Sequence, residues 1–459
     1  MDALPNEILV QIFAYCTRGI YPGSLGPDTT TLYNVCLVSP RFGALAQPLL
    51  YQYLQLNCSK STYTTFRERF NARPDLRRAV RFVLLDTLSK DKGMPCLSHD
   101  DLKDLVQTLP NLEAFDSRCC DVTALVGWKS PAKPYERNIE KAFSGVKTMQ
   151  LNMQESSIGS IEAVFRLPRL EHLILRRLHL KNAERLRLRT EARLPTASWD
   201  FEAPSISTLE IELHPDDGYG SGQDFMFCFS VLNRLHTLRI LYQRRYFHQA
   251  EWRYIFKEPG AHFLESLRRL ELRAIDSTRN CEMIYRHYNF KDRLKESKLE
   301  YMDVNFRSIF PRPAIFLTMP ANTILMAADL RLPTTLRFLR LQFLENLEDV
   351  IVGWRVRGDA IKTFVGSIKD ALPALEVVEL EMHGIYDHGP YLVMLEKELR
   401  DFDITLHVFV YKSGETRGKS ETTRVFWKRW AMDDKIGQTT WSDDLLSARC
   451  KSMGDFPTC

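Results

Sequence analysis

A pattern of large aliphatic residues recurs along the middle of the chain in the form L-x-x-L-x-L, where L is any such residue. Ten matches begin at intervals of 24 to 39 residues, and most are followed by alternating apolar and polar positions, as in residues 209–213. Alternation with a period of two predicts β-strands. The ten matches are Val80–Leu85, Leu112–Ser117 (without its final anchor), Val146–Leu151, Leu170–Leu175, Ile206–Ile211, Leu235–Ile240, Leu267–Leu272, Leu299–Val304, Leu336–Leu341 and Leu375–Leu380.

Helix-like segments precede several of these matches. Residues 98–101 form a capping-box-like start, after which Leu102, Leu105, Val106 and Leu109 follow helical spacing. Repetition of strand, turn, helix and return predicts an α/β solenoid, in which each unit buries its apolar face against its neighbours. A single irregular α/β domain with unstacked strands is the alternative. The array resembles a leucine-rich-repeat protein, although most intervals exceed the 20–29 residues usual for that repeat.

If the strands are parallel, the apolar anchors point inward and the residues between them form a concave outer face. Charges of both signs on that face suit a protein client with complementary charge, and a plain solvated sheet face is the alternative. A flanking row on the same face includes Arg269 and Phe338. We expect the client to contact Glu210, Arg239, Glu271, Tyr301, Asp303, Arg340 and Glu379.

The first fifty residues predict three short helices. Pro5 suits a first helical turn, and apolar residues then follow helical spacing as far as Cys16. Thr31 could cap a second helix, and Ser39 with Pro40 marks the start of a third. Because a module of this size has a thin core, apolar residues in excess of that core predict a docking face.

Leu-Pro-Asn-Glu-Ile-Leu at residues 4–9, Ile12-Phe13 and Cys-Leu-Val-Ser-Pro-Arg-Phe at residues 36–42 resemble an F-box, in the form common in fungal proteins. The resemblance implies docking on the Skp-type adaptor of cullin–RING ubiquitin ligases. Two features depart from the family: a long Gly/Pro-rich loop at 19–30, and Pro48 within the third helix, where it should kink or shorten the helix. The residues implied to contact the adaptor are Leu4, Pro5, Ile8, Leu9, Leu37 and Val38.

The expected organisation is therefore α/β, with a small N-terminal helical F-box at 1–56 and an irregular leucine-rich-repeat-like solenoid at 57–410. Residues 411–459 are expected to form a C-terminal cap and a partly disordered tail, in which Trp427 and Trp430 either share a helix face or cover the open end of the array. A generic helical cap on a larger fold is the alternative for residues 1–56.

Composition is that of a globular protein, with 459 residues, 44% hydrophobic residues and a formal net charge of +4. That balance does not favour nucleic acid as the main partner. Ten scattered cysteines without a C-x-x-C pair indicate free thiols in a reducing compartment. No apolar run approaches a membrane span and no secretory leader is recognised, so we expect a cytoplasmic or nuclear protein.

Candidate chemistry is sparse. A basic stretch at 176–193 could bind a phosphorylated client or nucleic acid, and residues 214–224 are expected to be a flexible insertion. His383 and His388 have the nearest spacing to a metal pair, but a loop is the better interpretation. No G-x-S-x-G, H-E-x-x-H or post-strand G-x-G-x-x-G motif is present, so we expect no catalysis, cofactor or metal.

The sequence therefore predicts a non-catalytic, substrate-recognition subunit of an SCF-type ubiquitin ligase. Its F-box would bind the Skp-type adaptor, and through it a cullin, while the repeats bind a protein client. Two alternatives remain: an F-box scaffold without ubiquitin transfer, and a repeat protein that binds nucleic acid through the basic stretch.

Overall fold

The computed structural model describes residues 4–16, 29–57, 60–86, 99–117, 143–153, 162–178, 205–213, 231–242, 263–274, 294, 297–305, 332–343, 365–366, 368–383, 389–412 and 423–427. The chain folds as two compact units. The first comprises Met1–His236 with Pro259–Phe263, and the second comprises Thr237–Glu258 with Leu264–Cys459.

The first unit opens with three helices: α1 (Asn6–Cys16), α2 (Thr29–Val38) and α3 (Pro40–Leu50). Ser39 caps α3 as expected, because its hydroxyl accepts a hydrogen bond from the backbone N–H of Phe42. Pro48 lies inside α3, which ends two residues later at Leu50. Both α1 and α2 pack against α3.

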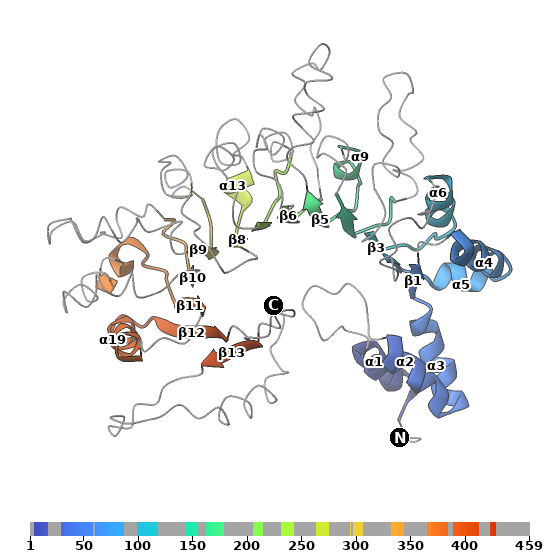
Figure 1. Ribbon diagram of the computed structural model, residues 1–459, viewed down its shortest axis with the longest axis horizontal. Helices are drawn as coiled ribbons and strands as arrows, with labels where there is room; N and C mark the ends of the chain where they lie inside the picture. The colour runs from blue at the N-terminus through green and yellow to red at the C-terminus, as the bar shows by residue number, and fades with distance from the viewer. Residues whose placement is uncertain are drawn as a thin grey trace, which may run out of the picture. The chain divides into compact units, whose positions relative to one another are not determined.

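In the described part of the first unit six strands follow, and β1 to β6 pair in parallel in sequence order (Figure 1). They are β1 (Tyr53–Asn57), β2 (Phe82–Asp86), β3 (Ala114–Ser117), β4 (Thr148–Asn152), β5 (His172–Leu178) and β6 (Thr208–Leu213). The helices between them are α4 (Lys60–Asn71), α5 (Pro74–Ala79), α6 (His99–Gln107) and α9 (Glu162–Phe165).

The second unit continues the same plan. Strands β7 to β12 pair in parallel in sequence order, and β13 closes the unit antiparallel to β12. The strands are β7 (Thr237–Tyr242), β8 (Arg269–Ala274), β9 (Tyr301–Asn305), β10 (Phe338–Phe343), β11 (Val377–His383), β12 (Thr405–Lys412) and β13 (Thr423–Trp427). The helices α13 (Phe263–Ser266) and α19 (Gly389–Arg400) accompany them, and α19 packs against β12.

All ten aliphatic matches contain a strand, so the α/β class and the parallel pairing are confirmed. The anchors are buried as predicted: Leu235, Leu238 and Ile240 around β7 are all 0% exposed. Three strands were not predicted, namely β1, β12 and β13. Because Trp427 ends a strand, the alternative that places it on a helix face is wrong. Trp430 lies outside the described residues.

Candidate functional site

Six large hydrophobic side chains are exposed on the helices α1 and α2 and the residues just before them. Within the described ranges, every exposed large hydrophobic side chain belongs to this group. Their exposed fractions range from 38% for Leu4 to 67% for Leu37 and Val38. We call them the apolar patch: Leu4, Ile8, Ile12, Tyr33, Leu37 and Val38.

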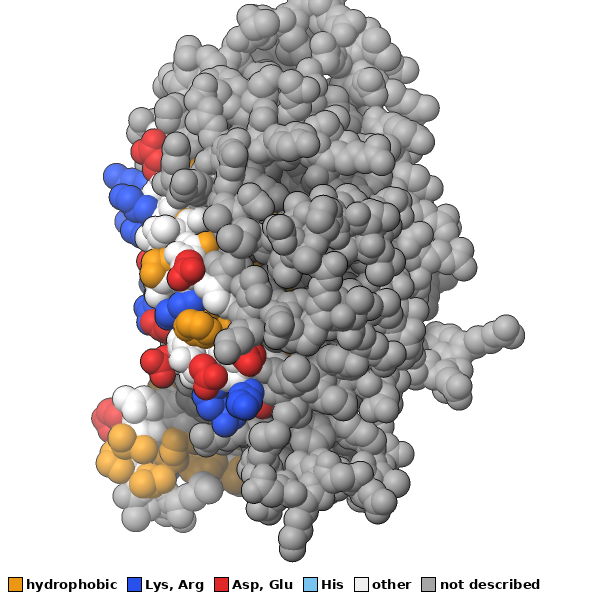
Figure 2. Space-filling model, turned by 90° about the vertical axis from the view of Figure 1, so that its left-hand side faces the viewer, with side chains coloured by type: hydrophobic (Ala, Val, Ile, Leu, Met, Phe, Trp, Pro, Cys, Tyr) orange, Lys and Arg blue, Asp and Glu red, His pale blue; other side chains and the backbone are white. Residues whose placement is uncertain are grey.

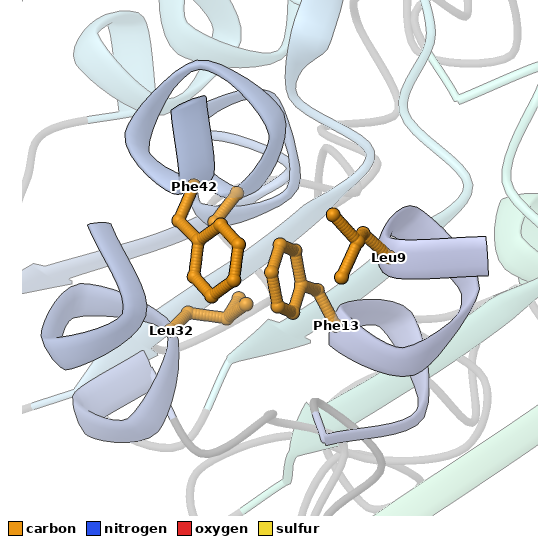
Figure 3. Packing of buried hydrophobic residues seen from close by; sticks show 5 residues of the cluster. Leu9, Phe13, Leu32 and Phe42 are labelled. Carbon is orange, nitrogen blue, oxygen red and sulfur yellow. The ribbon is translucent and has the colours of Figure 1, made fainter. Parts of the chain in front are cut away.

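The apolar patch exists because α1 is apolar on two faces. Ile8 and Ile12 are one turn apart and exposed, whereas Leu9 and Phe13 are one turn apart and buried at 1% and 4% exposure. Figure 3 shows Leu9 and Phe13 meeting Leu32 and Phe42 in the core of the three helices. The small core is thus filled by one face of α1, which leaves the other face without cover in the described structure.

The helix α2 repeats this arrangement. Leu32 is fully buried in the same core, while Tyr33 and Leu37, one turn apart, are exposed. Val38 ends α2 beside Leu37 and is equally exposed. Cys36 is half-buried, and burial raises the pKa of its thiol, which keeps it protonated and a poor nucleophile.

Most of the residues implied to contact an adaptor are accessible. Leu4, Pro5, Ile8, Leu37 and Val38 are all exposed. The implied adaptor contact at Leu9 is corrected by the structure. Leu9 is only 1% exposed and belongs to the core, because its side chain packs with Phe13 and Leu32 and does not reach solvent.

Sequence reasoning missed Ile12 and Tyr33 as members of the apolar patch. A signal for both was available. Ile12 lies four residues after Ile8, and Tyr33 lies four residues before Leu37, so each shares a helix face with a predicted contact residue.

Arg41, in the first turn of α3, joins the segment before α1 to α3. Its Nη2 donates to the backbone carbonyl of Leu4 at 2.6 Å, and both Nε and Nη2 donate to Oδ1 of Asn6, at 3.0 and 2.9 Å. These contacts attach residues 4–6 to the corner between α2 and α3, four residues beyond Leu37.

The second feature is a row of polar side chains at consecutive paired positions of β7 to β12. Each row member is the register partner of the next, on the face opposite the apolar anchors. We call it the polar row: Arg239, Glu271, Asp303, Arg340, Glu379 and His407.

Ion pairs run along the polar row and into the strand positions beside it. Arg273 Nη2 lies 2.6 Å from Asp303 Oδ2, and Gln342 donates to the other Asp303 oxygen at 2.9 Å. Arg340 Nε donates to Glu381 at 2.9 Å and lies 3.7 Å from Asp303. Burial alone would lower the pKa of Arg340, but the surrounding carboxylates outweigh burial and raise it.

The ends of the network are also paired. Arg239 Nε lies 3.1 Å from Glu271, which also pairs with Arg269 at 2.6 Å. At the other end, His407 Nδ1 lies 3.3 Å from Glu379. Charges of both signs are therefore neutralised locally, within the sheet face.

The structure places most of the predicted client residues deeper than the sequence suggested. Glu210, Glu271, Asp303, Arg340 and Glu379 are all buried. Arg239 and Tyr301 are partly exposed. Client contact by these seven residues remains a prediction, but five of them offer little surface to a partner.

The row that flanks the polar row is more accessible. Arg269 is exposed, and Tyr301 and Phe338 are partly exposed. The Arg269 guanidinium lies 4.0 Å from the centroid of the Tyr301 ring, and that ring stacks on Phe338 with centroids 4.9 Å apart. We call Arg269, Tyr301 and Phe338 the stacked row.

In the first unit, Glu210 pairs with Arg176 at 2.7 Å, and Arg176 also contacts Glu212 at 3.1 Å. Arg176 is the first residue of the predicted basic stretch, and its charge is matched within the sheet. Arg177 adopts a left-handed backbone conformation with φ of 54° where the β5–β6 register shifts. The stretch beyond residue 178 lies outside the described residues.

Metal chemistry finds no support in the described part of the chain, where no cluster of three His, Cys, Asp or Glu side chains could hold an ion. The side chain of His383, all of His388 and the segment 214–224 lie outside what the structure describes.

None of the described helices is both long and apolar enough to span a bilayer. On the face shown in Figure 2, acidic and basic side chains are interspersed.

The sequence matches no protein-family model, and no curated protein is significantly similar to it. The apolar patch, the polar row and the stacked row are therefore the features of this chain that bear on its function.

Proposed function

We propose that the chain is a non-catalytic receptor subunit of an SCF-type, cullin–RING ubiquitin ligase. In this account residues 1–56 are an F-box that docks on a Skp-type adaptor, and the strands that follow form a leucine-rich-repeat-like array that holds a protein client. The main support for this proposal is the apolar patch, because exposed large hydrophobic side chains are confined to it among the described residues.

The distribution of exposed side chains supports docking through α1 and α2. Contiguous exposed apolar surface on a soluble protein marks an interaction site, and covering one large apolar side chain contributes about 1.5–3 kcal/mol. Five of the six residues implied by the F-box resemblance are exposed, and the sixth, Leu9, supports them from the core. A helical module that fills its core with one face of each helix has the other face available for an adaptor.

The client side of the proposal is supported by the parallel strands in sequence order. Repeated strand–helix units that pair only with their neighbours are typical of solenoids, which present an extended sheet face to partners. On that face the stacked row is accessible, while the polar row is largely buried and paired. We therefore assign the first client contacts to Arg269, Tyr301 and Phe338.

Catalysis in this account takes place on the E2 partner of the ligase. The receptor raises the effective concentration of a client lysine near the charged E2 and supplies no reactive group of its own. The proposed location is the cytoplasm or the nucleus, where such ligases act. The same geometry fits an F-box scaffold without ubiquitin transfer, so the experiment must score the cullin and client conjugates as well as the adaptor.

Affinity purification of the full chain tests the proposal. The wild type should recover the adaptor, the cullin and ubiquitin-conjugated clients, and a Leu4→Ala/Pro5→Ala variant should lose the first two. Glu68→Lys, an exposed change on α4 in the same unit, is the matched control. Recovery of adaptor without cullin or conjugates would favour the scaffold, and unchanged recovery by the Leu4/Pro5 variant would contradict the proposed docking.

A further inference from the structure

One arginine, Arg41, lies three residues after the last member of the apolar patch and contacts the residues around its first member. Leu4 lies 34 residues before Val38, and it precedes the first residue of α1. The three hydrogen bonds from Arg41 to the Leu4 carbonyl and the Asn6 side chain hold that segment against the start of α3. Residues 4–6, held in this way, are called the N-terminal arm.

We propose that Arg41 is a positioning residue for adaptor docking, which orders the N-terminal arm and presents Leu4 beside the end of α2. This inference rests on the proposed function. Arg41 does not need to touch the adaptor in this role. It acts through Leu4, by removing conformational freedom that the arm would otherwise lose on binding.

The chemistry of the contact requires a guanidinium. Nη2 reaches two acceptors, the Leu4 carbonyl at 2.6 Å and Asn6 Oδ1 at 2.9 Å, while Nε reaches Asn6 Oδ1 at 3.0 Å. A planar guanidinium satisfies these directions together, whereas a lysine ammonium on a flexible stem cannot reproduce two bonds that converge on one oxygen while a third reaches the Leu4 carbonyl. Arg41→Lys should therefore behave more like Arg41→Ala than like the wild type.

The contact is separate from the core that folds the three helices. That core consists of Leu9, Phe13, Leu32, Phe42 and Ala46. The helix α1 also has its own first-turn bond, from the Leu9 N–H to the Pro5 carbonyl at 3.1 Å. Loss of Arg41 should therefore free Leu4, at the start of the arm, while Pro5 and Asn6 stay attached to α1 and the helices remain packed.

Titration of the purified full chain with purified adaptor gives the first readout. We expect Arg41→Ala to weaken binding by about fivefold to tenfold, with an unchanged thermal unfolding transition. Arg67→Ala is the matched control, because it removes another arginine side chain of the first unit that has a defined partner, in this case an ion pair with Asp104 at 3.0 Å. That control should bind the adaptor as the wild type does.

A double-mutant cycle separates positioning from a simple contact. Leu4→Ala should weaken binding in the wild-type background and have little further effect in the Arg41→Ala background. Tyr33→Ala, a patch residue on α2 away from the arm, should have the same effect in both backgrounds.

The outcomes are distinct. Wild-type affinity of Arg41→Ala, or an undiminished effect of Leu4→Ala in that background, overturns the positioning role while the proposed function stands. If the wild-type chain itself does not bind the adaptor, the proposed function is rejected and the docking role of Arg41 with it.

Discussion

The Phe13 ring meets the Phe42 ring edge to face, with centroids 5.3 Å apart, and so joins α1 to α3. Its neighbour in sequence, Ile12, is 43% exposed. Two consecutive residues of α1 therefore differ in role: Phe13 holds the three helices together, and Ile12 is available to a partner. This division between core and apolar patch makes folding and docking separately testable.

Phe42→Ala should unfold or loosen the three helices, because removing a buried ring from a thin core costs about 3–5 kcal/mol. Val38→Asp should leave the helices folded, because Val38 is exposed. Hydrogen exchange of the α1–α3 amides distinguishes the two, with rapid exchange expected only for Phe42→Ala. Equal loss of protection in both variants would show that the apolar patch also serves the fold.

Arg340 occupies the centre of the polar row, and its removal should destabilise the second unit strongly. Arg340→Ala leaves the carboxylates of Asp303, Glu379 and Glu381 with one guanidinium fewer in a buried site, which costs about 3–5 kcal/mol. Chemical denaturation measures the change.

The control for this loss is Arg337→Ala, at the exposed residue just before the same strand, β10. Arg337 pairs with Glu376 at 2.8 Å, but both side chains are more than half exposed. Water and salt screen such a pair, so we expect a far smaller effect than at Arg340. Equal losses at the two positions would contradict the structural role assigned to the polar row.

The pH dependence of stability should carry a contribution from Tyr301. Burial, followed by the nearby carboxylates of Asp303 and Glu271, raises the pKa of Tyr301 to about 12 from its ordinary 10.0. The unfolded chain releases this proton first, so stability is fully present below pH 10 and is lost as the pH rises from 10 through 12.

Urea unfolding at pH 9 and pH 11 measures this contribution. Between these values the wild type should lose roughly 1 kcal/mol more than Tyr301→Phe, which has no such proton. Parallel losses in the two proteins would mean that Tyr301 is not held in its neutral form by the fold.

Client retention should depend on the stacked row. Arg269→Ala combined with Phe338→Ala removes both neighbours of the Tyr301 ring and should reduce recovery of clients several-fold while adaptor recovery is unchanged. Arg337→Ala, exposed but outside the stacked row, should retain the clients. Unchanged client recovery by the double variant would remove the stacked row from the binding surface.

The sequence could predict the strands because their signal is local. An aliphatic triplet followed by alternating positions identifies a strand whatever that strand pairs with. The match Leu336–Leu341, for example, overlaps β10. The strand β13 escaped prediction because it lacks the aliphatic triplet and follows a polar stretch. The start of α3 was predictable because Ser39 and Pro40 form a local signal.

The candidate site was predictable only in part. The F-box resemblance implied adaptor contacts at Ile8 and Leu37, and both side chains are exposed, but Leu9 required knowledge of which face of α1 meets α3. The burial of Asp303 depends on Arg273 and Gln342 from neighbouring positions of the sheet, and no local pattern encodes it. The contact between Arg41 and the N-terminal arm joins residues 35 and 37 positions apart, which sequence periodicity does not indicate.

The proposed function requires that an adaptor cover the apolar patch. Calorimetric titration of the full chain with purified Skp-type adaptor, for the wild type and Val38→Asp, measures this directly. The account predicts tight binding by the wild type, with a negative heat-capacity change from apolar burial, and loss of at least tenfold in affinity for Val38→Asp. Equal affinities for the two proteins, or no binding by a folded wild type, would contradict it.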